Sequence, residues 1–488
     1  MTLPTPHDPP AVGEKIRRLV DFASRLDFAA LPDDAQRVAR GLTLDVLGAI
    51  AQASSPRYAA GRMLFAHARD EGGNPLATVV GGGFRTSCAQ AALVNGTLGY
   101  YCDVEPHHPG AIMHGMAIVV PAALAVGERE HASGLEFMSA VVAGVDVACR
   151  VANAIDPTAL YRRGMHPSCL AGAFGACAAA ARLLRLDEAR FRHALGLCGT
   201  QASGLLAWET DPTEHSRPFN PGIAARNGVT AALLASLGFG GPPDVFEGRF
   251  NVFGAFSERQ SDRVPGARPR AGRGARSGGA WGRPEELTRA LGEDLLITGF
   301  AVKLYSCCAF LHPGLDALLG VLRQHPLRPA EVERIDLRFP TNGVKLIDGN
   351  ELKSHCAQYV LPIALKDGRV TIDDILQDRR EDPEIDALSR RVRVVADDEL
   401  DRTFPERYAT VVEVTTRAGE VLRQRVDYAR GTAENPVSYD GIAAKFDALA
   451  APALGAGRAS HVKGLLGGIE RLDDVTTLAD TLREPTAG

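Results

Sequence analysis

The sequence predicts a mostly α-helical protein with one large helical domain and a smaller α+β domain. Residues 11–250 show helical apolar spacing, whereas the chain after about residue 330 alternates apolar and polar residues and is rich in valine. A chain of 488 residues is also too long for one ordinary core, so two or three domains are expected.

Three stretches support the helical prediction. LPDDAQRVARGLTLDVLGAI offers an N-cap at Asp33 and apolar residues every three or four positions from Val38 to Ile50. AGAFGACAAAARLLRL (171–186) is dominated by alanine and glycine, which let helices approach closely, so it predicts a central buried helix. VTAALLASLGFGG (229–241) has the same character and ends at glycines, a helix C-terminus signal.

The later part of the chain predicts strands. VERIDLRFP and RRVRVVAD are each typical of one strand, and YATVVEVTTRAGEVLRQRV indicates two strands joined by a turn at Ala418-Gly419. Between them, SHCAQYVLPIALKDG (354–368) predicts a helix that ends at Gly368. SYDGIAAKFDALAAP returns to a helical pattern. We therefore expect a helical domain over residues 1–258 and an α+β domain over 286–435.

Residues 259–285 are expected to form a disordered Arg/Gly-rich loop between the domains. The segment DRVPGARPRAGRGARSGGAWGRP has no apolar periodicity. Its arginines could touch nucleic acid or an acidic partner. The rest of the chain is mildly acidic, with a net charge of −5 and pI ≈ 6.2 overall, so a solvated insertion is favoured and no nucleic-acid partner is expected.

The composition is that of a globular protein, 45% hydrophobic and 23% charged. The N-terminus has no apolar signal-peptide region, and the longest apolar stretch, Ala117–Val126, is too short to span a bilayer. We therefore predict a cytoplasmic protein without a membrane partner. The nine cysteines are scattered without a C-x-x-C and are expected to be small core residues.

The stretch YYCDVEPHHPGAIMHGM (100–116) concentrates residues that could carry chemistry. Two acids, Asp103 and Glu105, precede three histidines, His107, His108 and His114, among prolines and glycines typical of a loop. Imidazole and carboxylate groups could bind a metal or exchange protons. The spacing matches no H-E-x-x-H signature, so the residues alone leave both readings open.

Further candidates follow along the chain. His166 in RRGMHPSCLAGAFGA lies next to a helix start, whose dipole favours the neutral base form. Arg217 in EHSRPFNPGIAARNG precedes a small-residue helix and could bind a carboxylate or phosphate, while Asn-Pro-Gly is typical of a turn. Lys303 lies in an apolar run, where a buried lysine needs a partner or a function. His355 and Tyr359 share one face of the expected helix, where core packing is the simpler reading.

The sequence contains no G-x-G-x-x-G after a strand, no Walker loop and no G-x-S-x-G elbow. Hydride transfer, nucleotide chemistry and serine hydrolysis are therefore disfavoured. The remaining His, Asp, Tyr, Lys and Arg residues suit proton abstraction from, and addition to, an anionic small molecule.

These stretches, in this order, resemble the MmgE/PrpD family over nearly the whole chain. The strongest are LVNGTLGYYCDVEPHHPGAIMHG, RRGMHPSCLAGAFGACAAAARLL, RPFNPGIAARNGVTAALLASLGFGGP, VKLYSCCAFLHPGLDAL and SHCAQYVLPIALKDGRV. The family includes 2-methylcitrate dehydratase, cis-aconitate decarboxylase and iminodisuccinate epimerase. The resemblance implies a helical domain completed by residues 436–488, an α+β lid domain, a homodimer, and no metal or other cofactor.

The resemblance also implies roles for individual residues. The catalytic residues would be Asp103, His107, His114, His166, Lys303 and Tyr359, and Arg217 and His108 would bind substrate. Two departures stand out. The F-D-D-T that usually follows the first aspartate is replaced by V-E-P-H (104–107). Arg217 stands where decarboxylase-like members carry a lysine, so it can bind a carboxylate but cannot exchange protons.

The expected function is a cofactor-independent lyase that dehydrates or decarboxylates a small di- or tricarboxylic acid by acid–base proton transfer. Two alternatives stay open: an epimerase acting at a carbon next to a carboxylate, and a non-catalytic carboxylate-binding member.

Overall fold

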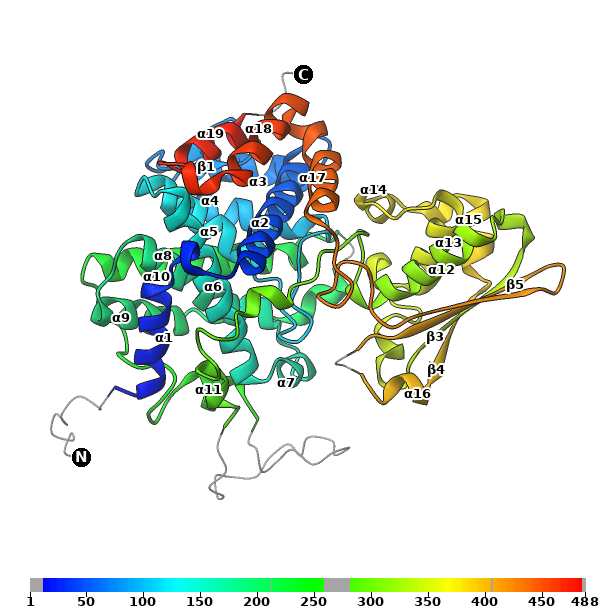
Figure 1. The fold of residues 1–488 in the computed structure, drawn as a ribbon, viewed down its shortest axis with the longest axis horizontal. Coiled ribbons are helices and arrows are strands. Elements are labelled where there is room, and N and C mark those ends of the chain that lie inside the picture. Colours follow the sequence, from blue (N-terminus) through cyan, green and yellow to red (C-terminus); the bar gives the residue numbers. More distant parts are fainter. Residues whose placement is uncertain (1–11, 212, 259–280, 405–406, 485–488) are drawn as a thin grey trace.

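The structure is a computed structural model, and it describes residues 12–211, 213–258, 281–404 and 407–484. A large body of helices lies beside a smaller body built on a β-sheet (Figure 1). This confirms the predicted fold class. Most of the expected Arg/Gly-rich loop, residues 259–280, lies outside the described residues, and the exact domain limits stay a prediction.

The large body is formed mainly by the first half of the chain. Its helices are α1 (Glu14–Arg25), α2 (Asp33–Ser54), α3 (Ala59–Glu71), α4 (Cys88–Tyr101), α5 (Met116–Arg129), α6 (Gly134–Ile155), α7 (Pro157–Arg162), α8 (Pro167–Leu183), α9 (Glu188–Gly199), α10 (Ser216–Ser236) and α11 (Val252–Phe256). Helix α2 begins at Asp33 itself, with Pro32 in the N-cap position, one residue earlier than predicted. A hairpin of β1 (Ala77–Val79) and β2 (Phe84–Thr86) was not predicted, because strands this short carry no readable periodicity.

Small residues set how closely the helices of this body pack. A Cβ built on Gly144 of α6 would lie 2.7 Å from the carbonyl oxygen of Gly175 of α8, so the two helices cross with their backbones almost in contact. Every residue of α8 except Arg182 is buried. The predicted central, buried, small-residue helix is therefore confirmed.

The same close approach corrects one prediction. Asn220-Pro221-Gly222, typical of a turn in sequence, lies inside α10. A Cβ on Gly222 would lie 2.1 Å from the Thr97 hydroxyl of α4, so the glycine lets the two helices meet. Tertiary packing outweighs the local turn preference here, because the closeness of the helices buries both of them.

The smaller body is built on a four-stranded sheet in the order β4-β3-β5-β6. The strands are β3 (Val332–Pro340), β4 (Val392–Asp397), β5 (Thr410–Thr416) and β6 (Val421–Val426). Strands β3 and β4 are parallel and the other pairs antiparallel. The predicted hairpin is found, with Gly419 at φ +85° in its turn.

Helices α12 (His312–Gln324) and α13 (Ala357–Asp367) pack against this sheet. The smaller body also contains α14 (Ile372–Leu376), α15 (Pro383–Ser389) and α16 (Asp398–Asp401). Helix α13 ends at Gly368 as predicted but begins only at Ala357, because the chain before it, Lys353–His355, forms a 3-10 turn. His355 and Tyr359 therefore do not share a helix face, contrary to the prediction.

The last helices return to the large body: α17 (Tyr439–Leu454), α18 (Ala456–Gly467) and α19 (Thr476–Arg483). Phe446 of α17 packs on Gly48 of α2, where an added Cβ would lie 3.0 Å from its ring. The backbone N–H of Gly81 donates to the carbonyl of Leu482 at 2.9 Å. Across the described ranges, each helix is too short or too polar to span a lipid bilayer.

Candidate active site

The loop after α4 is held next to Lys303 by backbone pairing. Asp103 adopts φ +52°, the left-handed conformation that aspartate tolerates better than most residues, and it turns the chain out of α4. Further on, His107 exchanges backbone hydrogen bonds of 3.0 and 2.7 Å with Ala301. Because Ala301 is two residues before Lys303, this pairing brings the lysine to the acidic start of the loop.

Lys303 forms a buried ion pair at this loop. Its ammonium nitrogen lies 2.5 Å from Asp103 Oδ1 and 3.4 Å from Glu105 Oε1, and its residue exposure is only 1%. Burial alone would lower the pKa of Lys303, but the charges of Asp103 and Glu105 outweigh it and hold the pKa above its ordinary value. The lysine therefore remains charged.

Arg217, in the first turn of α10, lies on the other side of Asp103. Its Nη1 is 3.3 Å from Asp103 Oδ1, its Nε donates to Glu214 at 3.3 Å, and its guanidinium lies over the Tyr100 ring. Burial alone would raise the pKa of Asp103, but the charges of Lys303 and Arg217 hold it below its ordinary range. Asp103 is thus an ionised carboxylate between two cations, which makes it a poor proton acceptor.

Glu105 and His114 form a second pair in the same loop. Glu105 Oε1 lies 2.6 Å from His114 Nδ1. Burial, with the neighbouring charge of Asp103, raises the pKa of Glu105 to about 8 against the opposing effect of Lys303. Burial, with the charge of Lys303, lowers the pKa of His114 well below its ordinary value. At neutral pH the pair is therefore a neutral carboxyl hydrogen-bonded to a neutral imidazole.

His166 completes the histidine cluster. It is the N-cap residue of α8, is fully buried, and donates its backbone N–H to the Gly204 carbonyl at 2.9 Å. Its ring lies about 6 Å from the rings of Tyr100, His114, Tyr161 and Trp208. Burial lowers the pKa of His166, so the ring is neutral. Among the described residues, neither ring nitrogen has a hydrogen-bond partner, which is costly unless a ligand supplies one.

The smaller body covers this cluster with His355. The His355 ring lies 6.2 Å from that of Trp208, which in turn contacts His166, and the Ser354 hydroxyl holds His355 Nδ1 at 3.0 Å. Burial lowers the pKa of His355 to about 4, with Asp103 opposing and the cations Arg217 and Lys303 adding to the effect. The site is thus enclosed by both bodies.

Two predicted site residues have other contacts. His108 accepts a hydrogen bond from Ala111 N–H at 3.0 Å and packs edge-on against Phe300, so its ring fastens the loop. The Tyr359 hydroxyl lies 2.5 Å from the Asp374 carbonyl and accepts from Arg379 N–H at 3.1 Å, all within the smaller body. Neither contact involves the ionised cluster. His107 lies nearer, with its ring 6.0 Å from that of His114.

Two residues of the cluster, Tyr100 and His355, received no catalytic or binding role from the sequence. Glu105 was singled out together with the histidines of its loop, but the resemblance gave it no role of its own. Tyr100 and His355 join the cluster only through tertiary packing, which periodicity does not reveal. In the part of the chain that the structure describes, no three His, Cys, Asp or Glu side chains converge as metal ligands would.

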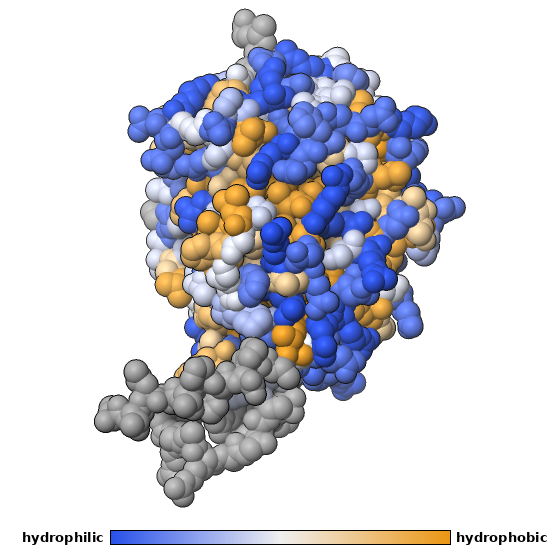
Figure 2. Space-filling model, turned by 90° about the vertical axis from the view of Figure 1, so that its left-hand side faces the viewer, coloured by the Kyte–Doolittle hydropathy of each residue, from blue (hydrophilic) through white to orange (hydrophobic). Residues whose placement is uncertain are grey.

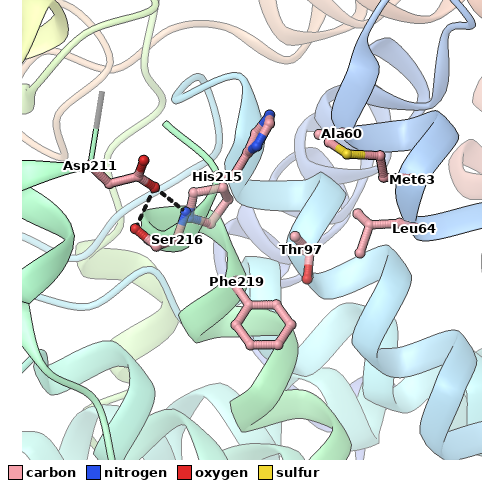
Figure 3. Close-up of a pocket in the computed structure, with 9 residues that line it drawn as sticks. Ala60, Met63, Leu64, Thr97, Asp211, His215, Ser216 and Phe219 are labelled. Atoms are coloured by element: carbon pink, nitrogen blue, oxygen red, sulfur yellow. Dashed lines mark hydrogen bonds between the residues drawn. The ribbon is translucent and has the colours of Figure 1, made fainter. Parts of the chain in front are cut away.

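A shallow apolar hollow lies beside the start of α10. It measures about 310 Å³ and is lined mainly by Met63 and Leu64 of α3, Thr97 of α4, and Pro218 and Phe219 of α10, with Asp211 accepting hydrogen bonds from Ser216 at its edge (Figure 3). Met63 and Phe219 are exposed. Hydrophobic residues also gather in the middle of the molecular face on the α10 side (Figure 2). Most of the surface that lines the hollow is apolar.

Buried acids, cations and histidines enclosed by a helical body and a sheet-containing body are typical of an enzyme active site. The chain belongs to the MmgE/PrpD family: the model of the MmgE/PrpD N-terminal domain matches residues 17–264, and that of the C-terminal domain matches residues 305–465. This confirms the family inferred from the sequence motifs.

Curated relatives of the chain carry the names of lyases. The cis-aconitate decarboxylase-like protein oryM of Aspergillus oryzae is 26% identical over 82% of this chain and 83% of its own length. The cis-aconitate decarboxylase of Mus musculus is 26% identical over 83% and 80%, respectively. The mitochondrial 2-methylcitrate dehydratase of Yarrowia lipolytica is 34% identical, but over only 16% of each chain.

Proposed function

We propose that this protein is a lyase that works without a cofactor on a small di- or tricarboxylic acid, by decarboxylation or dehydration of a cis-aconitate-like or 2-methylcitrate-like substrate. The observation that carries the proposal is a buried Asp103 carboxylate between Lys303 and Arg217, next to neutral histidines that have unused ring nitrogens. Cis-aconitate decarboxylase and 2-methylcitrate dehydratase relatives support the substrate class.

Arg217 and Lys303 would bind the substrate carboxylates. A substrate carboxylate can replace part of the contact that Asp103 makes with each cation, so binding exchanges one ion pair for another without exposing charge to water. Loss of CO₂, or of a proton from carbon, leaves an electron pair on the substrate as an enolate-like anion. The two fixed cations stabilise this anion in a site of low polarity.

The proton would move through the histidines. His166 and His114 are neutral, so each can accept a proton at one ring nitrogen or donate one from the other. The Glu105 carboxyl is hydrogen-bonded to Nδ1 of His114, so Glu105 can supply the proton that His114 transfers to the substrate. Asp103, ionised between two cations, would keep Lys303 and Arg217 in place instead of exchanging protons with the substrate.

The smaller body would act as a lid over the substrate. His355 and Trp208 lie over the histidine cluster, and removing water there strengthens each interaction of the cations with the substrate.

Proton NMR in D₂O tests the function. Purified protein is mixed with cis-aconitate, 2-methylcitrate, citrate and iminodisuccinate in turn. A lyase gives the signals of a new or rearranged double bond with one of the first three acids. The Lys303→Met variant, prepared in parallel, must lose that activity, which excludes a contaminating enzyme. Deuterium incorporation at one carbon without loss of water or CO₂ would instead indicate an epimerase and overturn the lyase proposal. Binding without any exchange would indicate a non-catalytic member.

We further propose that the protein is a homodimer whose contact includes the apolar hollow of Met63, Leu64, Pro218 and Phe219. An exposed apolar surface of this kind on an enzyme is commonly covered by a partner chain. Light scattering should give the mass of a dimer for the wild type and of a monomer for Met63→Glu. Val421→Glu, at an exposed apolar residue of β6, serves as the control and should stay dimeric. A monomeric wild type would contradict the proposal.

A further inference from the structure

A buried ion pair outside the cluster grips the loop that carries it. Lys445 of α17 lies 2.6 Å from Asp45 Oδ1 of α2, and its ammonium also donates to the Val104 carbonyl at 2.6 Å. Asp45 is fully buried, and the Lys445 side chain is 11% exposed. Val104 is the residue between Asp103 and Glu105, so a helix from the end of the chain contacts the loop between its two acids.

An ion pair is a costly way to join two helices. Apolar residues of similar size would join α17 to α2 as firmly, because burying two charges has a desolvation cost that their attraction only partly offsets. Helix α17 already packs on α2 through Phe446 at Gly48 and Ile442 at Gly41. The feature that apolar packing could not provide is a donor to the Val104 carbonyl.

The position of this carbonyl decides what the donor controls. The oxygen belongs to the peptide unit that links Val104 to Glu105, so any rotation of that unit redirects the Glu105 side chain and the backbone that follows Asp103. The titratable groups around the ammonium are Asp45, Glu105 and Lys303. Lys445 therefore interacts electrostatically with the cluster, but its ammonium lies outside the space between Lys303 and the histidines.

We propose that Lys445, held by Asp45, is a positioning residue: by binding the Val104 carbonyl it fixes the loop so that Asp103 meets Lys303 and Arg217 while Glu105 meets His114. The inference deepens the proposed function, since it concerns the geometry of the same site. It assigns α17 a part in the active site, in addition to its part in completing the helical body.

The test compares Lys445→Met with Lys463→Met. Lys463 of α18 forms an ion pair with Asp447 of α17 at the partly exposed surface, so it matches Lys445 in residue type and helix contact but is remote from the loop. Lys445→Met should lower kcat about 10- to 100-fold, the usual effect of misplacing catalytic groups by about 1 Å. It should also speed hydrogen–deuterium exchange of the amides around residues 102–108, measured by mass spectrometry. Lys463→Met should change neither value.

Two results would overturn the inference: wild-type kcat with wild-type loop exchange in Lys445→Met, or a loss of kcat without faster loop exchange. If Lys445→Met does not fold, Lys445→Arg carries the test, because its longer planar head must displace the loop. Unchanged kcat and exchange in that variant would overturn the inference as well. Hydrogen–deuterium exchange of the loop can be measured without substrate. A wild-type protein that transforms none of the acids would contradict the proposed function. The exchange comparison alone would then decide whether Lys445 positions the loop.

Discussion

The ammonium of Lys303 lies 2.5 Å from the carboxylate of Asp103, although 200 positions separate the two residues along the chain. Both groups are buried, so the pair is kept at a desolvation cost. Arg217 shares the same carboxylate. The arrangement keeps two cations charged and oriented in a buried site, which is what stabilisation of an enolate-like charge requires.

Lys303→Met should abolish function and weaken the fold. Removing one cation from the anion site should lower kcat/KM about 100- to 1,000-fold. The loss of one partner of a buried pair should also lower the free energy of unfolding by about 3 kcal/mol, near the bottom of the usual range because Arg217 still neutralises Asp103. Kinetics and urea unfolding check both values. Lys463→Met, at a partly exposed pair, should change the free energy of unfolding by less than about 1 kcal/mol.

Glu105→Gln should flatten the pH dependence of stability. The pKa of Glu105 rises from 4.5 to about 8 on folding, so its contribution is fully present below pH 4.5 and is lost as the pH rises through about 8. Between pH 4.5 and about 8, the wild-type free energy of unfolding should therefore fall more steeply with pH than that of the variant. The difference in slope should be at most about 1.4 kcal/mol per pH unit. Asp45, raised to about 6, contributes a fall of the same sign in both proteins. Parallel slopes in urea titrations from pH 5 to 8 would refute this assignment.

His166→Asn should lower kcat at least about 100-fold while KM stays within a few-fold, because His166 is proposed to move protons and not to hold carboxylates. Burial keeps the pKa values of His166 and His114 well below 6.5, so the wild-type rate should show no loss near pH 6.5 from their protonation. The control is His131→Asn, at an exposed pair with Asp474, whose loss should leave kcat within a few-fold. Equal losses in the two variants would contradict the assignment of roles.

Much of the fold could be predicted from the sequence because its signals are local. The alternating β5–β6 segment with Gly419 in its turn, and the small-residue helix α8, have patterns that only one kind of structure accommodates well. The Asn220-Pro221-Gly222 run was misread because its helix is stabilised by contact with α4, which lies more than a hundred residues earlier in the chain. No local pattern reports such a contact.

Site residues could be predicted from the sequence where a charged or titratable side chain stands among residues that do not usually accompany it. Lys303 in an apolar run and the acids beside histidines at Asp103 indicated a function, and the structure brings them together. The contacts of Tyr359 with the Asp374 and Gln377 carbonyls and the approach of His355 to Trp208 each join separate segments of the chain, so no local pattern shows them. The resemblance could transfer residue types between chains, but it could not reveal which way a hydroxyl points.

Tyr359→Phe separates a structural from a catalytic hydroxyl. The hydroxyl contacts the backbone of Asp374, Gln377 and Arg379, so its removal should cost about 1 kcal/mol of stability. The kcat of the variant should stay within about threefold of the wild type, since no reacting group lies at that hydroxyl. Steady-state kinetics and thermal unfolding measure the two effects. A loss of activity above 100-fold with unchanged stability would restore the catalytic role that the sequence suggested.

Gly222→Ala tests whether the helix crossing sets the geometry of the site. The added Cβ would lie 2.1 Å from the Thr97 hydroxyl and 2.5 Å from the Leu93 carbonyl, so α4 and α10 must move apart. Such overpacking costs about 1–3 kcal/mol, which outweighs the gain of about 1 kcal/mol from replacing glycine by alanine in a helix. Asp103 follows α4 and Arg217 begins α10, so the same movement should lengthen their 3.3 Å contact and lower kcat/KM about tenfold or more.

The matched control is Gly464→Ala in α18, where an added Cβ would meet no atom within 4 Å. Here only the helix propensity changes, so the variant should be as active as the wild type and more stable by up to about 1 kcal/mol. Urea unfolding and steady-state kinetics on both variants make the comparison. If Gly222→Ala proved as stable and as active as Gly464→Ala, the close crossing of α4 and α10 would not control the Asp103–Arg217 contact, and the position of Arg217 would have to depend on Glu214 and Tyr100 instead.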